Sequence, residues 1–158
     1  MSRETGDFAT TIVVDQSPSE VFDAVVNVRG WWSAGIVGRT EQQDDEFLFE
    51  VEGIHRSTQL LTEVVPDRRV VWLVTDARMT FLEHEGEWVG TRVIFDISEK
   101  DGRTQLAFTH EGLAPGVECF DACAPAWTQY VRNSLFSLIT TGVGRPNLEG
   151  RAIEVPTR

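Results

Sequence analysis

The stretch that decides the fold is TRVIFDISEKDGRTQLAFTHE, residues 91–111. In its first half Val93, Phe95 and Ile97 fall on one face, the period-two pattern of a half-buried strand. The dipeptide Asp101-Gly102 then favours the two-residue turn of a β-hairpin. One face of the return segment carries Thr104, Leu106, Phe108 and His110. The stretch therefore predicts an antiparallel hairpin with one apolar face.

Strand patterns continue upstream of this hairpin. Alternation predicts strands around residues 47–51, 57–65 and 69–75, the second closed by Pro66-Asp67, whereas residues 76–90 are mixed and rich in turn signals. Residues 8–14 form a further strand pattern near the start of the chain. After it, Ser17, Pro18 and Glu20 combine an N-cap, a first-turn proline and a capping box, so a short helix is expected to run to Gly30. Trp31-Trp32 follows in a turn or a second short helix.

The chain closes with a long helical pattern over residues 117–141. Apolar residues recur there at helical spacing, and Gly142 supplies a stop. Pro125 lies inside the pattern and lacks a backbone donor, so a kink or a break is expected near residues 121–124. The order of elements predicts one α+β domain over residues 1–158, with a curved antiparallel sheet of about six to seven strands around the final helix. A space between such a sheet and its helix is a natural small-molecule site.

Several motifs resemble the START-like superfamily, also called SRPBCC or Bet v 1-like. They are residues 14–22, the Trp31-Trp32 pair, residues 87–91, 108–113, 127–130 and 141–146. The tryptophan pair and the later motifs resemble its subgroup named after the activator of Hsp90 ATPase. The resemblance covers about residues 8–146 and leaves 147–158 as a tail. It implies the helix-grip fold, and it implies a cavity that in other members binds lipids, sterols, hormones or polyketides.

Composition narrows the classes of partner. The 158 residues carry 14 basic and 25 acidic side chains, a formal net charge of −11, which argues against nucleic acid and anionic membranes as partners. No apolar run is long enough to insert into a membrane, and the first residues lack a signal-peptide core, so a cytoplasmic protein is expected. Cys119 and Cys123 are interpreted as buried helix residues, with a redox pair as the alternative.

Candidate site residues come from the predicted concave face and the final helix. The expected lining of the cavity is aromatic, with His110 and Tyr130 as polar anchors. The full set is Trp31, Trp72, Phe81, Phe108, His110, Trp127 and Tyr130. His55 and His84 lie near expected turns and are taken as exposed. No cluster of metal ligands, phosphate loop or serine-nucleophile motif is recognised, so neither a metal nor a cofactor is expected.

Three functions are consistent with these features. The first is a non-enzymatic protein that binds a small hydrophobic molecule in the internal cavity. The second is an enzyme of cyclase or hydrolase type that uses the same cavity, with His110 as acid or base. The third is a chaperone-linked or self-associating protein that uses surface aromatic residues such as Trp88, with a homodimer as an open alternative. The absence of a recognisable catalytic set favours the first.

Overall fold

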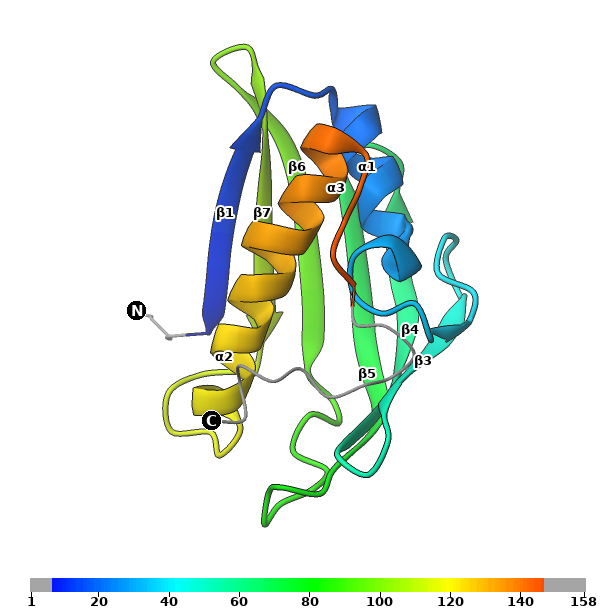
Figure 1. The fold of residues 1–158 in the computed structure, drawn as a ribbon, viewed down its shortest axis with the longest axis vertical. Helices are drawn as coiled ribbons and strands as arrows, with labels where there is room; N and C mark the ends of the chain where they lie inside the picture. Colours follow the sequence, from blue (N-terminus) through cyan, green and yellow to red (C-terminus); the bar gives the residue numbers. More distant parts are fainter. Residues whose placement is uncertain (1–6, 147–158) are drawn as a thin grey trace.

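A computed structural model describes residues 7–146 of the chain, so the tail expected at 147–158 lies outside the described residues. One antiparallel sheet of seven strands forms the framework, in the order β1-β7-β6-β5-β4-β3-β2. The strands are β1 (Phe8–Val14), β2 (Val37–Gly38), β3 (Glu46–Val51), β4 (His55–Val65), β5 (Arg69–Met79), β6 (Arg92–Lys100) and β7 (Arg103–Glu111). The expected α+β helix-grip fold is confirmed: the C-terminal helix lies along one face of the curved sheet (Figure 1).

The local signals in the sequence act as expected. Asp101 and Gly102 both have positive φ, as the predicted two-residue turn requires, and they join β6 to β7. Helix α1 (Pro18–Val26) begins with Ser17 as N-cap; Glu20 N donates to Ser17 Oγ, and Ser17 N donates to the Glu20 carboxylate, which completes the capping box. The helix ends at Val26, four residues before the end expected at Gly30, and a 3₁₀ turn, η1 (Val28–Gly30), leads from it to the tryptophan pair.

The C-terminal helix differs from expectation in its details. It consists of α2 (Phe120–Thr128), a π-helical segment η2 (Gln129–Leu135) and α3 (Phe136–Thr141), and it is continuous. The predicted start at 117 is therefore three residues early, and the helix does not break at Pro125. Pro125 is the sixth residue of α2, so it removes only the bond that its amide would make to the Asp121 carbonyl. Gly142 ends the helix in the left-handed conformation, as predicted.

Two features of the sheet were not predicted. Strand β2 is a two-residue edge strand, too short for its alternation to be recognised. Strand β5 runs on to Met79, beyond the expected end at residue 75, because a bulge between Thr58 and Gln59 restores its pairing with β4. The extension carries β5 to the end of the sheet where the N-terminus of α2 lies.

Candidate functional site

The volume between the sheet and the C-terminal helix is filled by a cluster of aromatic rings. All five tryptophans of the chain belong to it. Trp32, from the turn after η1, stacks on Phe49 with a centroid distance of 4.1 Å. Its ring also lies 5.4 Å from that of Trp72 on β5 and 5.1 Å from that of Trp127 on α2. Rings from the sheet and the helix therefore meet around Trp32.

Six of the seven predicted site residues lie in this cluster. Trp31, Trp72, Phe108, His110, Trp127 and Tyr130 are all buried. Phe81 is not with them, because it lies in the loop between β5 and β6 and is 50% exposed. Trp32 and Trp88 were not among the predicted site residues, yet both are as central to the cluster as those residues.

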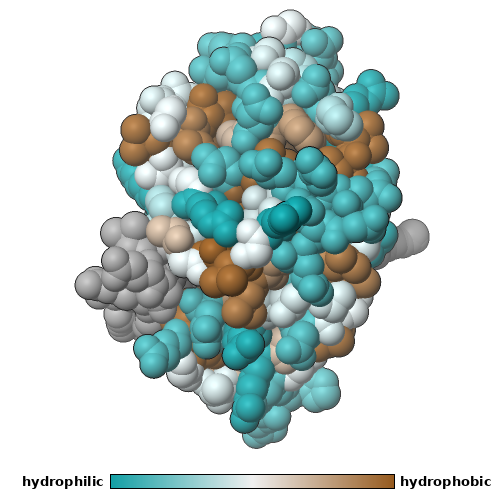
Figure 2. All heavy atoms as spheres, turned by 90° about the vertical axis from the view of Figure 1, so that its right-hand side faces the viewer, coloured by the Kyte–Doolittle hydropathy of each residue, from teal (hydrophilic) through white to brown (hydrophobic). Residues whose placement is uncertain are grey.

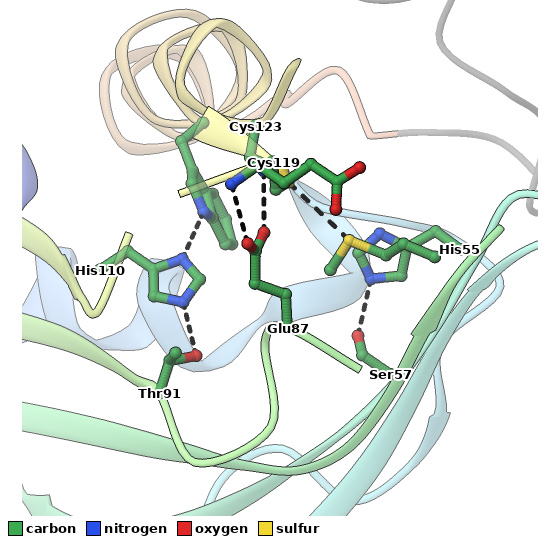
Figure 3. The surroundings of a disulfide bond; sticks show 10 residues. His55, Ser57, Glu87, Thr91, His110, Cys119 and Cys123 are labelled. Atoms are coloured by element: carbon green, nitrogen blue, oxygen red, sulfur yellow. Dashed lines mark hydrogen bonds between the residues drawn. A yellow bond between two sulfur atoms is a disulfide. The ribbon is translucent and has the colours of Figure 1, made fainter. Parts of the chain in front are cut away.

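His110 is held from both sides of its ring. Thr91 Oγ1 donates to the Trp88 carbonyl at 2.6 Å and accepts from His110 Nε2 at 2.8 Å. Trp127 Nε1 donates to His110 Nδ1 at 3.0 Å. These partners fix a neutral imidazole protonated on Nε2, and burial, aided by nearby His55, lowers the pKa of His110 to about 3. Both ring nitrogens are occupied, so neither is available for proton transfer to a substrate (Figure 3).

A second polar group, which the sequence pattern did not single out, lies on the inner face of β4. His55, Ser57 and Gln59 alternate along this face, with His55 Nε2 2.9 Å from Ser57 Oγ and Gln59 Nε2 donating to Ser57 Oγ at 2.6 Å. The His55 ring is enclosed edge-on between Phe49 and Trp88, contrary to the exposed position expected for it. Burial lowers the pKa of His55 to about 3, so this imidazole is also neutral at physiological pH.

Trp88 connects the two histidines. Its ring packs edge-on against His55 at 4.8 Å and against His110 at 4.7 Å, and it stacks on Trp127 at 6.0 Å. The ring is carried by the β5–β6 loop and not by a strand or a helix. The expectation that Trp88 lies at the surface is therefore wrong, since the side chain is 4% exposed; no periodicity marks a loop residue as internal.

Carboxylates fasten the β5–β6 loop to the N-terminus of α2. The Glu87 carboxylate accepts from the amides of Glu118 and Cys119, both at 2.8 Å (Figure 3). In return the Glu118 carboxylate accepts from the amides of Glu83 and His84, and these bonds lower its pKa. The negative charge of Glu87 also complements the positive end of the helix. This end of the interior is thereby closed.

Cys119 and Cys123, at the start of α2, are both buried, as expected, and they are paired as a disulfide. Met79 Sδ lies 3.8 Å from Cys119 Sγ. Among residues 7–146 no group of three or more His, Cys, Asp or Glu side chains is arranged to hold a metal ion. In the same part of the chain, no helix is long and apolar enough to cross a membrane.

Two hollows lie outside the aromatic cluster. One of about 890 Å³ is lined by residues that include Pro18, Arg69 and Asp96, near the start of α1. The other, of about 290 Å³, is lined by residues that include Arg29, Thr40 and Asp45. Both are lined largely by polar and charged residues, so neither matches the apolar site expected between sheet and helix.

Comparison with known proteins shows which solved structures share this fold. No family model matches the chain, and no curated protein matches it. Among solved structures it is similar to the Aha1 dimer from Colwellia psychrerythraea, with a TM-score of 0.70, 20% identity, and coverage of 89% of this chain and 100% of that one. It is also similar to SSP2350 from Staphylococcus saprophyticus, with a TM-score of 0.65, 16% identity, and coverage of 90% and 98%.

A third similar structure is DynU16, a protein of the dynemicin biosynthetic locus. Its TM-score is 0.64 at 14% identity, and the match covers 92% of this chain and 52% of that one. Together with the seven-stranded sheet and its long C-terminal helix, these likenesses show that the chain has an Aha1-like helix-grip fold.

Proposed function

We propose that the protein binds a small hydrophobic molecule that contains a ring, in the interior between the sheet and the C-terminal helix. The observation that carries this proposal is the aromatic cluster: Trp32, Trp72 and Trp127 come from a turn, a strand and a helix and meet in one buried volume. Flat faces and ring edges at these distances are the surfaces on which an aromatic ligand stacks. The similarity to SRPBCC-type structures supports the same location.

Binding at this place requires part of the cluster to move, because the protein's own rings occupy the volume. The ring of Trp32 is carried by a turn, so it moves at a lower cost in backbone hydrogen bonds than Trp72 or Trp127. We expect the ligand to replace the contacts that the Trp32 ring makes. Affinity is then reduced by the free energy needed to open the cluster.

Nuclear magnetic resonance tests the proposal directly, because all five indole N–H groups are in the cluster. Signals would be assigned with single Trp→Phe variants and followed during titration with naphthalene, 2-naphthol and a short lipid. A ligand in the interior shifts several indole signals together, including that of Trp127, and does so with one-to-one stoichiometry. If the folded protein takes up none of these compounds, or if they shift only backbone signals of surface strands, the proposal is wrong.

Self-association is a second candidate, favoured by the β5–β6 loop. Phe81 and Val89 are 50% and 48% exposed there, and the similar Aha1 structure is a dimer. Elsewhere, on the face shown in Figure 2, hydrophobic side chains lie in separate groups among hydrophilic ones. Sedimentation equilibrium of Phe81→Ser tests the candidate, with Val65→Ser, which is 40% exposed on another hairpin, as the matched control. A concentration-independent monomer for the wild type would eliminate it.

A further inference from the structure

We propose that the ligand carries a neutral hydroxyl group, and that this hydroxyl donates to the side-chain oxygen of Gln59 and accepts from the indole N–H of Trp88. The inference rests on the proposed function, since it names the chemistry that the interior selects. It follows from two buried polar atoms that the fold leaves unpaired, one an acceptor and one a donor.

Gln59 supplies the acceptor. It is fully buried on the inner face of β4, where its strand partners are Phe47 on β3 and Val74 on β5. Its Nε2 donates to Ser57 Oγ at 2.6 Å. Its Oε1 has no hydrogen-bond partner among the residues that the structure describes. A carbonyl oxygen of this kind, surrounded by apolar residues, is destabilising unless a donor reaches it.

Trp88 supplies the donor. The side chain is 4% exposed, and its Nε1 also has no hydrogen-bond partner within residues 7–146. The contrast with other tryptophans is clear, because Trp31 Nε1 donates to the Val25 carbonyl and Trp127 Nε1 donates to His110. Buried indole N–H groups ordinarily find an acceptor. Trp88 therefore differs from Trp31 and Trp127 of the same cluster.

The two atoms belong to the same part of the interior. The His55 ring contacts Trp88 at 4.8 Å between centroids and bonds through Ser57 to the Gln59 amide. The Trp88 loop is also fixed to the strand next to Gln59, because Gly90 N donates to the carbonyl of Val74 at 2.8 Å. His55 and Val74 thus each connect the part of the sheet that carries Gln59 to the loop that carries Trp88.

The polarity of the pair selects the ligand's functional group. A hydroxyl can donate to Gln59 and accept from Trp88 at once, whereas a carboxylate has no proton for Gln59 and an ammonium has no acceptor for Trp88. A charge would also be unfavourable, because the buried polar residues of the described chain are all uncharged and the buried histidine, His110, accepts a hydrogen bond as a neutral ring. The favoured class is therefore a phenol or an alcohol on a hydrophobic ring system. A trapped water molecule is the competing occupant.

The experiment compares 2-naphthol with naphthalene, which differ in the hydroxyl alone, by isothermal titration calorimetry. For the wild type we expect 2-naphthol to bind about tenfold more tightly. Trp88→Phe keeps a ring and removes the N–H, and Gln59→Leu removes the acceptor; each should bring the ratio of affinities close to one. Gln16→Leu is the matched control, because Gln16 Oε1 is also unpaired and buried, but lies next to the N-cap of α1.

The outcomes separate the two proposals. If both probes bind the wild type equally, water holds the pair, and the hydroxyl inference is overturned while the proposed function stands. The inference is also overturned if the preference survives in Trp88→Phe. If neither probe binds, the proposed function itself fails. Near-ultraviolet circular dichroism checks that each variant is folded, and Trp88→Phe alone decides the matter if Gln59→Leu does not fold.

Discussion

The neutral state of His110 makes the stability of the protein depend on pH. Burial lowers the pKa of His110 from 6.5 to about 3 in the folded state, so between these values the unfolded chain binds a proton that the folded chain does not. Stability is therefore complete above about pH 6.5 and decreases as the pH falls toward 3. At pH 5 the difference corresponds to about 2 kcal/mol for this one group, at ~1.4 kcal/mol per pKa unit.

Urea denaturation at pH 7 and pH 5 measures this effect, with His110→Gln as the test variant. The glutamine cannot take up a proton, so we expect this variant to be less stable at pH 7 and yet to lose about 2 kcal/mol less than the wild type between the two pH values. His84→Gln is the control, because His84 is exposed in the β5–β6 loop and should leave the wild-type dependence unchanged. The pH range stays above the ordinary pKa values of carboxylic acids, which limits their contribution.

The reasoning is refuted if His110→Gln and the wild type lose the same free energy of unfolding between pH 7 and pH 5. Such a result would mean that His110 takes up its proton in the folded state, which requires the bond from Trp127 Nε1 to Nδ1 to be broken. The buried position of the ring and its tautomer would then both be wrong. His55 contributes in the same direction, so His55→Gln should reduce the remaining pH dependence further.

Two further predictions concern stability at neutral pH. Glu87→Gln weakens the hydrogen bonds to two amides at the start of α2 and should reduce the free energy of unfolding by about 1 kcal/mol. Glu85→Gln is the control, because it removes only an exposed ion pair with Arg78 and should cost less than ~0.5 kcal/mol. Urea denaturation measures both losses, and equal losses would show that the cap contributes nothing. Gly144→Ala places a methyl group against the Gly30 carbonyl oxygen and should lower the melting temperature by at least ~5 °C, corresponding to ~2 kcal/mol or more. Gly53→Ala is the control: the space there is open, so this change should cost about 1 kcal/mol for its positive φ alone. A Gly144→Ala variant as stable as the wild type would contradict this packing.

The sequence determined those features of the fold that depend on neighbours in the chain. The capping box at Ser17, the Asp101-Gly102 turn and the glycine stop at Gly142 are each set by a few adjacent residues, and all three are found where they were expected. Period-two alternation likewise located most strands, because side-chain direction in a strand is fixed by the backbone. Several motifs in the right order were enough to indicate the helix-grip fold.

The candidate site was only partly accessible from the sequence. Alternation placed Phe108 and His110 on the inner face, and helical spacing placed Trp127 opposite them. Phe81 was expected in the interior because it is aromatic, although it lies exposed in a loop, and Trp88 was expected at the surface, although a loop carries it inward. Residues in loops lack a period, so their direction follows from contacts that are distant in sequence.

Only the tertiary structure decided the chemistry of the interior. Whether His110 is a free base or a bonded neutral ring depends on Thr91 and Trp127, which lie 19 and 17 residues away and meet it only when the sheet curves around the helix. The unpaired oxygen of Gln59 has the same origin, since it is buried between neighbouring strands that contribute Phe47 and Val74 and none of the described residues supplies a donor. Hydrogen-bond satisfaction is a property of the assembled core, because every donor and acceptor there competes for partners that the local sequence does not specify.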